Sequence, residues 1–372
     1  MNSSSDLVPF NDLSRTPPEV MASIEGAIAR VLASGWYVMG PEHDAFENEL
    51  AAYLSASHVV LLGNGTDALE LALGAVGVGA GDRVVTVANA GAYSTVAMRL
   101  LGARPAFADV DPASLLMTAA TFQTAIDALD APPRAVVVTH LYGAMADVAG
   151  IVAIARPLGI AVVEDCAQSL GASAGGVKAG MFGDIATTSF YPTKNLGALG
   201  DGGAVYTNDA ELATSVRRMR QYGWISKYHI AFDHGRNSRL DELQAAILRV
   251  KLPLLDGWNQ RRREIHTSYE AASSRMVNRD SESFIGHLAV AISDNRDETR
   301  AALRASGVAT DVHYPLPDHH QDFPSDRPEP ISLPATEAAS AAVYSVPMFP
   351  ELTDSEVERV SAALASLGDS RG

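Results

Sequence analysis

The chain lacks a second cysteine and any long apolar run. Only Cys166 among its 372 residues is a cysteine, so no disulfide can form within the chain and a reducing compartment suits it. No run of about 18 apolar residues occurs, so we expect no membrane span. The start, MNSSSDLVPFNDLSR, has neither the basic nor the apolar region of a signal peptide. Together these absences predict a cytoplasmic protein.

Basic side chains are also scarce. Lysine and arginine number 28 against 44 aspartates and glutamates, and the net charge is −16. A nucleic-acid binder usually carries a basic face, so this balance argues against one. A nucleotide-bearing small molecule is not excluded, because one local cationic pocket can hold it. We therefore expect an enzyme for small molecules, with neither nucleic acid nor membrane as partner.

Short apolar runs alternate with helical patterns through the first two-thirds of the chain. The runs predict strands at His58–Leu62, Arg83–Ala88, Arg104–Asp109, Ala135–Leu141, Ala161–Asp165, Ile185–Phe190 and Ala204–Thr207. Helices are predicted between them at Thr66–Ala75, Ser94–Leu101, Ala119–Leu129 and Asp147–Leu158. Strands separated by helices build a mainly parallel sheet covered on both faces. The expected fold class is α/β, with seven strands in that sheet.

The pattern changes in the last third of the chain. Helical stretches are predicted from about Arg239 to Leu252, where Pro253 interrupts, and from Leu255 into the 260s. A smaller α+β unit follows, with a strand at Leu288–Ile292, helices at Arg296–Ser306 and Asp354–Leu367, and a loop at Tyr314–Pro334. We expect an N-terminal arm at 1–20, a large domain at 21–250 and a small C-terminal domain at 251–372.

The segment 189–207, SFYPTKNLGALGDGGAVYT, places Lys194 among apolar and glycine residues directly after a predicted strand. Burial lowers the pKa of a lysine, and the neutral amine is a nucleophile toward carbonyl carbon. A lone lysine of this kind would most simply belong to a surface loop. Two further segments favour the functional interpretation, because ligands of parallel sheets bind at the carboxyl ends of strands.

The first of these segments is Gly63-Asn64-Gly65-Thr66-Asp67, between a predicted strand and a helix. Exposed backbone amides at a helix N-terminus favour an anion such as phosphate. The segment matches neither a Walker A loop nor GxGxxG. A tight turn with a capping side chain explains it equally well.

The second is Glu164-Asp165-Cys166-Ala167-Gln168, at the end of another predicted strand. A carboxylate there can pair with a protonated ring nitrogen, and Gln168 can donate to a phenolic oxygen. A helix N-cap is the alternative. A lysine, a pyridinium partner and a phosphate cradle, with the Ser189 hydroxyl added, are what pyridoxal phosphate requires.

Nine motifs in order span nearly the whole chain: VPFNDLSR, SGWYVMGPEHDAFE, GNGTDALELAL, THLYGAMAD, EDCAQSLGA, SFYPTKNLGALGDGGAVYT, GRNSRLDELQAA, HYPLPDHHQ and SVPMFPELT. Together they resemble the DegT/DnrJ/EryC1/StrS family of sugar aminotransferases. These are pyridoxal-phosphate enzymes of fold type I, the aspartate-aminotransferase fold. The resemblance therefore implies this fold, this cofactor and transamination.

The resemblance also implies roles for individual residues in cofactor binding. Lys194 would bind the cofactor covalently and carry the proton between cofactor and substrate. Asp165 would keep the pyridine nitrogen protonated, and Gln168 would contact the ring oxygen. Gly65, Thr66 and Ser189 would bind the phosphate, Asn237 would reach it from the neighbouring subunit of a homodimer, and Tyr93 would stack on the ring. The spacing in NAGAYST departs from the family pattern around Tyr93.

Substrate contacts are expected, by resemblance or from aromatic and basic patterning, at Tyr191, Trp224, Tyr228, His313, Tyr314 and His319. The run around Trp224 is explained equally well by a packed surface loop. The histidines near His319 offer no fixed coordinating set, so no metal is expected. The run Arg261–Arg263 predicts a solvated or salt-bridged helix face.

The resemblance is closest to the branch that aminates C-3 of the sugar, through the segment SFYPTKNLGALGDGG. It implies a nucleotide-linked 3-keto-6-deoxyhexose, dTDP-linked, as substrate and L-glutamate as amino donor. Amination at C-4 or of a cyclitol is the alternative within the same chemistry. A non-catalytic regulatory protein with a retained fold is the alternative of another class, and it would predict loss of Lys194 or Asp165, both of which are present.

Overall fold

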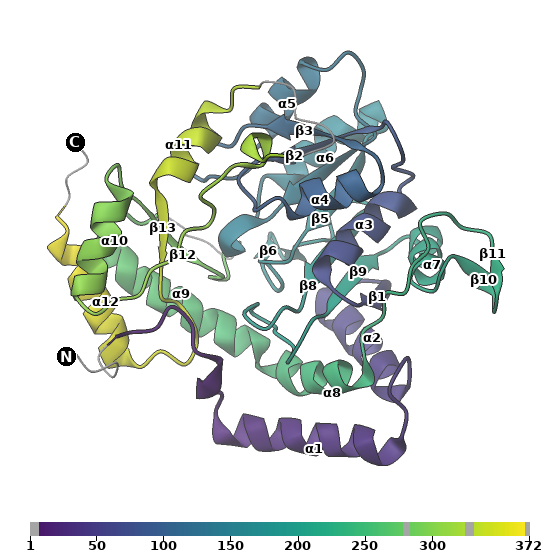
Figure 1. Ribbon diagram of the computed structural model, residues 1–372, viewed down its shortest axis with the longest axis horizontal. Helices are drawn as coiled ribbons and strands as arrows, with labels where there is room; N and C mark the ends of the chain where they lie inside the picture. The colour runs from purple at the N-terminus through teal and green to yellow at the C-terminus, as the bar shows by residue number, and fades with distance from the viewer. Residues whose placement is uncertain (1–6, 278–282, 324–330, 369–372) are drawn as a thin grey trace.

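The computed structural model describes residues 7–277, 283–323 and 331–368. Its centre is a seven-stranded sheet in the order β1-β9-β8-β5-β4-β2-β3 (Figure 1). Strand β9 is antiparallel to both of its neighbours, and the other adjacent pairs are parallel. The bounds are β1 His58–Leu62, β2 Arg83–Val87, β3 Arg104–Ala108, β4 Ala135–Thr139, β5 Ala161–Asp165, β8 Ile185–Ser189 and β9 Gly203–Thr207. All seven predicted strands are confirmed, with ends that differ by one or two residues at most.

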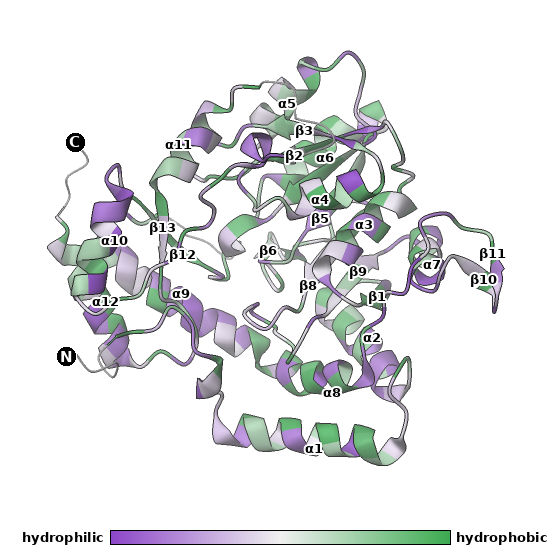
Figure 2. Cartoon of the chain, viewed as in Figure 1, coloured by the Kyte–Doolittle hydropathy of each residue, from purple (hydrophilic) through white to green (hydrophobic). Residues whose placement is uncertain are grey.

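Helices cover both faces of the sheet, as expected. One face packs against α3 (Gly65–Ala75), α4 (Tyr93–Leu100) and α7 (Ala210–Met219). The other packs against α2 (Pro41–Leu54), α5 (Ala119–Asp127), α6 (Val148–Ala155) and α8 (Glu242–Lys251). Successive side chains of β4 alternate between these two cores, so the strand is buried throughout and is apolar up to its last residue, Thr139. Figure 2 shows this concentration of hydrophobic residues on the central strands.

The last third of the chain continues the same core. A 3₁₀ turn at Leu252–Leu254 links α8 to α9 (Leu255–Ala272). Pro253 therefore lies in one tighter helical turn between two α-helices that follow each other directly. Strands β12 (Ala289–Ile292) and β13 (Val343–Val346) pair antiparallel, surrounded by α10 (Arg296–Ala305), α11 (Pro334–Ala342) and α12 (Asp354–Ser366). Their buried residues belong to the cluster that covers one sheet face. The division at residue 250 stays a prediction.

The predicted loop at Tyr314–Pro334 contains one short 3₁₀ helix, η5 (Asp318–His320), before it reaches α11. Residues 324–330 of that loop lie outside the described residues. No helix in the described ranges is long and apolar enough to cross a membrane.

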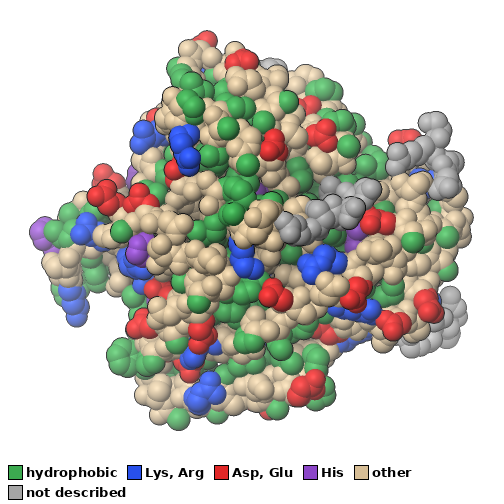
Figure 3. All heavy atoms as spheres, turned by 180° about the vertical axis from the view of Figure 1, so that it is seen from behind, with side chains coloured by type: hydrophobic (Ala, Val, Ile, Leu, Met, Phe, Trp, Pro, Cys, Tyr) green, Lys and Arg blue, Asp and Glu red, His purple; other side chains and the backbone are tan. Residues whose placement is uncertain are grey.

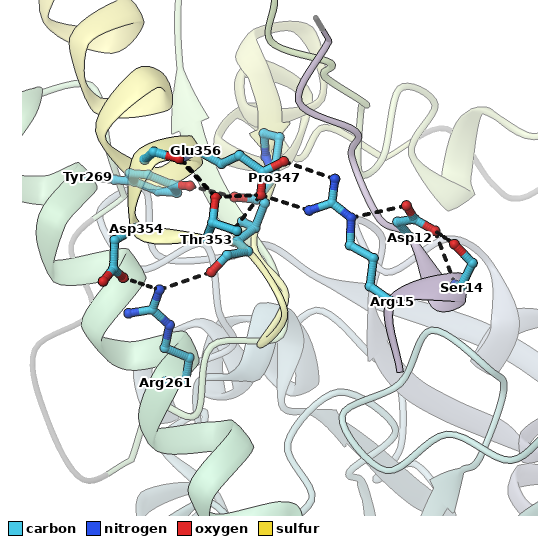
Figure 4. A network of polar contacts seen from close by, with 11 residues as sticks. Asp12, Ser14, Arg15, Arg261, Tyr269, Pro347, Thr353, Asp354 and Glu356 are labelled. Atoms are coloured by element: carbon cyan, nitrogen blue, oxygen red, sulfur yellow. Dashed lines mark hydrogen bonds and ion pairs between the residues drawn. The ribbon is translucent and has the colours of Figure 1, made fainter. Parts of the chain in front are cut away.

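The described part of the N-terminal arm, from residue 7 on, runs back across the C-terminal part of the molecule. Val8 donates its amide to the carbonyl of Gly307 at 2.9 Å. Arg15 forms a bidentate pair with Glu356 of α12, at 2.7 and 2.9 Å (Figure 4). Helix α1 (Pro18–Ser34) then packs against α8 (Figure 1). These contacts fix the arm beside the carboxyl edge of the sheet.

Candidate active site

A cavity of about 880 Å³ lies at the carboxyl ends of the parallel strands. Its walls come from the β1–α3 turn, the ends of β5 and β8, the loop after β8, the N-terminal arm, α9 and the β12–β13 unit. Many of the predicted site residues line it: Gly65, Thr66, Tyr93, Asp165, Ser189, Tyr191, Lys194, His313 and Tyr314. The fold thus brings together residues that are spread over most of the chain.

Lys194 lies in the tight loop that follows β8. Its amide donates to the carbonyl of Tyr191 at 2.8 Å. A Cβ at Gly197 would collide with the carbonyl oxygen of Pro192, so only glycine allows the loop to fold this closely. Burial lowers the pKa of Lys194 to about 8, and the charge of Asp165 partly opposes that shift. The cavity therefore contains an amine whose neutral fraction near neutral pH, roughly a tenth, is far larger than that of an exposed lysine.

Asp165 is the last residue of β5 and is buried. Burial raises the pKa of its carboxyl, while the Ala167 amide, which donates to Oδ1 at 3.1 Å, and the charge of Lys194 lower it. A buried carboxylate with a single amide donor is stabilised by a cation placed against it. Asp165 thus fits the role of partner to a protonated ring nitrogen.

The neighbouring carboxylate, Glu164, belongs to a buried hydrogen-bond network that stabilises the fold. Its oxygens accept from the amides of Gly180, Phe182 and Gly183 at 2.6–2.8 Å. His140 accepts the amide of Ala146 at Nδ1, so Nε2 carries the proton and donates to Glu164 at 2.9 Å. Adjacent residues of a strand point to opposite faces, which separates the buried network of Glu164 from the cavity side chain of Asp165.

The N-terminus of α3 and Ser189 form one end of the cavity. Asn64 caps the helix by accepting the amide of Asp67 at 2.8 Å. The amides of Gly65 and Thr66 in the first turn have no intrahelical partner. A Cβ on Gly65 would lie 2.7 Å from the Cβ of Ser189, so glycine leaves the space between helix and serine open. This end of the cavity can hold a phosphate.

Pyridoxal phosphate, the cofactor that the sequence resemblance implies, fits these residues. The cavity provides an amine in Lys194, a buried carboxylate in Asp165 and the cradle between Gly65, Thr66 and Ser189. Each is a group that the cofactor needs at its carbonyl, ring nitrogen or phosphate.

Tyrosines form the adjoining wall. Tyr93 is 51% exposed and meets Tyr314 edge to face, with ring centroids 6.3 Å apart. Gln168 is buried next to Tyr314: Nε2 donates to the Tyr314 hydroxyl at 3.1 Å, and Oε1 accepts the Tyr142 amide at 2.7 Å. Gln168 therefore positions Tyr314 in this structure. Its contact with a cofactor oxygen stays a prediction.

The other predicted site residues do not line this cavity. Trp224 and Tyr228 belong to the hairpin of β10 (Trp224–Ser226) and β11 (His229–Ile230), which projects from the body and is seen at the left edge in Figure 3. Asn237 is exposed. His319 contacts Glu337, with Nε2 3.2 Å from Oε1. The roles of these four residues stay predictions.

The expectation for Arg261–Arg263 is wrong for the middle residue. Arg261 pairs with Asp354 at 2.6 Å, as expected of a helix face (Figure 4). Arg262 is buried and lines the cavity. The burial of Arg262 could have been predicted from its place in the helical repeat of apolar and buried positions. The buried positions of α9 recur at three- and four-residue intervals and include Leu255, Asn259, Arg262, Ile265, His266 and Tyr269. Sequence reasoning also missed His287 and the arm residues Phe10 and Asn11 in the cavity wall.

Comparison with known proteins identifies relatives over nearly the whole chain. Residues 18–365 match the model of the DegT/DnrJ/EryC1/StrS aminotransferase family. The erythromycin biosynthesis sensory transduction protein EryC1 of Saccharopolyspora erythraea is 41% identical, over 96% of this chain and 98% of its own. The dTDP-3-amino-3,4,6-trideoxy-alpha-D-glucose transaminase of Streptomyces venezuelae is 39% identical, over 96% and 95%. The crystal structure of S. venezuelae DesV with a ketimine intermediate superposes with a TM-score of 0.92 at 37% identity, covering 98% of this chain and 99% of that one.

Proposed function

The chain belongs to the DegT/DnrJ/EryC1/StrS aminotransferase family, and on this basis we propose that it transfers the amino group of L-glutamate to C-3 of a dTDP-linked 3-keto-6-deoxyhexose. It is a pyridoxal-phosphate-dependent sugar aminotransferase. The overall exchange converts the keto sugar to an amino sugar and glutamate to 2-oxoglutarate. When bound, the cofactor supplies the electron sink for the carbon that loses a proton.

The observation that carries the proposal is Lys194 in the same cavity as Asp165. With a pKa of about 8, Lys194 can accept and return a proton near neutral pH, which suits general acid–base catalysis. Asp165 would hold the ring nitrogen protonated from its buried position at the end of β5. The α3 amides and Ser189 would fix the phosphate, so that the reacting carbon stays within reach of Lys194.

Two observations support C-3 and dTDP. The segment SFYPTKNLGALGDGG around Lys194 resembles the C-3 branch of the family. The name of the S. venezuelae relative specifies a dTDP-3-amino sugar. The volume of the cavity, about 880 Å³, is that of a small-molecule site, for which roughly 300–1,000 Å³ is typical.

The test is a panel of keto substrates offered to the purified, cofactor-loaded protein with L-glutamate. It includes dTDP-linked 3-keto and 4-keto hexoses, UDP-linked 3-keto sugars and a keto-cyclitol, with product detected by mass spectrometry. We expect the dTDP-linked 3-amino sugar to form fastest, together with an equal amount of 2-oxoglutarate. Faster amination of a 4-keto sugar, a UDP-linked sugar or the cyclitol would overturn the substrate assignment.

We further propose that the active unit is a homodimer with shared sites, in which Asn237 completes the partner's phosphate cradle. Asn237 is exposed and lies outside the cavity of its own chain. The nearby hairpin also exposes apolar surface, with Tyr228 78% and Ile230 63% accessible. Large exposed apolar side chains that cluster on a projection suit a subunit interface.

Subunit mixing tests this arrangement. Lys194→Ala and Asn237→Ala homodimers should each be inactive, whereas a mixed dimer has one site with both lesions and one with neither. An equal mixture should recover about one quarter of wild-type activity, because half the dimers are mixed and one site in two works. Lys194→Ala mixed with Asp165→Ala is the control, since these residues share a site and should give no recovery. If mass analysis verifies exchange and the first mixture stays inactive, Asn237 does not act across the interface.

A further inference from the structure

Arg262 is a buried cation in the wall of the active-site cavity, and none of the described residues gives it an acidic partner. Its residue is 5% exposed, and Nη1 donates to the carbonyl of Met348 at 2.7 Å. Nε is buried with no hydrogen-bond partner, and no carboxylate of the described residues lies within ion-pair distance of the guanidinium. Burial lowers the pKa of Arg262 to about 10, against the opposing charge of Glu351. A buried charge without a counter-ion is costly, which indicates that the partner belongs to a ligand.

Arg262 also lies in the neighbourhood of Lys194. Both residues line the main cavity, and both line a small adjoining cavity of about 60 Å³. Burial lowers the pKa of His287, a residue of the same wall, and the charges of Lys194 and Arg262 lower it further. Arg262, whose pKa of about 10 keeps it protonated at neutral pH, therefore places a positive charge in the neighbourhood of Lys194, and this charge favours an anion.

We propose that Arg262 binds the α-carboxylate of the amino donor. In an amino acid the α-carboxylate is one carbon away from the reacting carbon–nitrogen bond, so its binding site must lie close to Lys194. The diphosphate of a nucleotide sugar lies beyond the sugar ring from the keto carbon, which places it farther away. The planar guanidinium fork matches a carboxylate and tolerates burial better than an ammonium. The proposal rests on the proposed function, because it requires an amino acid as donor.

The experiment compares Arg262→Gln and Arg262→Lys with wild type, with Arg263→Gln as matched control. Arg263 lies on the same helix, outside the cavity, and donates to Gln260. The two half-reactions are followed separately by absorbance, one with L-glutamate and one with the amino-sugar nucleotide. Arg262→Gln should raise KM for glutamate on the order of 10- to 100-fold, with less than about a 3-fold change for the sugar. The KM of Arg262→Lys for glutamate should lie between those of wild type and Arg262→Gln, and the KM of Arg263→Gln should match that of wild type.

A donor analogue isolates the α-carboxylate itself. Wild type should bind L-glutamate on the order of 10- to 100-fold more tightly than its α-amide, L-isoglutamine, and Arg262→Gln should lose most of that preference. A readout independent of turnover is the unfolding temperature, which 2-oxoglutarate should raise in wild type and leave unchanged in Arg262→Gln.

A retained preference for glutamate over isoglutamine in Arg262→Gln overturns the proposal. So does an equal rise in KM for donor and sugar together with a lowered unfolding temperature, since that would make Arg262 a purely structural partner of Met348. If Arg262→Gln does not fold, the same measurements on Arg262→Lys decide. Failure of the proposed function is distinct, because wild type would then form no amino sugar with glutamate.

Discussion

The depressed pKa of Lys194 predicts how the apoprotein captures its cofactor as pH changes. Only the neutral amine attacks the cofactor's carbonyl carbon. With a pKa of about 8, roughly 10% of Lys194 is neutral at pH 7, against roughly 0.03% for a lysine of pKa 10.5. The reactive fraction is thus about 300-fold larger than for an ordinary exposed lysine. The shift arises from burial in the cavity wall, which disfavours the ammonium form.

The assay mixes apoprotein with pyridoxal phosphate from pH 6 to 10 and follows the absorbance change on covalent binding. Because the pKa of Lys194 is lowered to about 8, the rate of covalent binding should rise about tenfold per pH unit below pH 8 and level off above it. A free lysine derivative under the same conditions is the control for ionisations of the cofactor itself. Borohydride should then fix the cofactor on the peptide that contains Lys194.

A rate that keeps rising through pH 10 would refute the reasoning, because Lys194 would then titrate as an exposed lysine. Label on Lys178 or Lys227 would refute the assignment of the amine itself. Lys194→Ala should bind the cofactor only non-covalently and lose transamination by several orders of magnitude.

Two further substitutions test the remaining parts of the cofactor site. Asp165→Asn should shift the pH midpoint of cofactor capture below 8, since the carboxylate charge raises the pKa of Lys194. The same variant should greatly slow proton transfer in single-turnover measurements, and near-normal turnover would place the pyridinium partner elsewhere. Gly65→Ala should weaken cofactor binding on the order of 10- to 100-fold by equilibrium dialysis, because its Cβ would lie 2.7 Å from that of Ser189. Gly257→Ala, whose Cβ meets nothing within 4 Å, is the matched control. Equal cofactor affinities of the two variants would show that the phosphate does not bind between Gly65 and Ser189.

The sequence by itself determined the sheet and the cofactor chemistry. Strands buried on both faces need continuous apolar residues, so β4 and its neighbours appear as short runs that local pattern identifies. Because parallel strands end at one edge, the segments that carry Gly65, Asp165 and Lys194 were expected to converge, and they line one cavity.

Only the tertiary structure decided what completes the wall around Lys194. The buried spacing of α9 was visible, but an arginine is normally solvated, and packing against the C-terminal strands is what encloses Arg262. The arm residues Phe10 and Asn11 reach the cavity because Arg15 pairs with Glu356, 341 positions away. Contacts between segments so far apart leave no periodicity in the sequence, since they depend on how whole elements dock. For the same reason the hairpin that carries Trp224 projects away from its own cavity, although its residues resemble a substrate-binding segment.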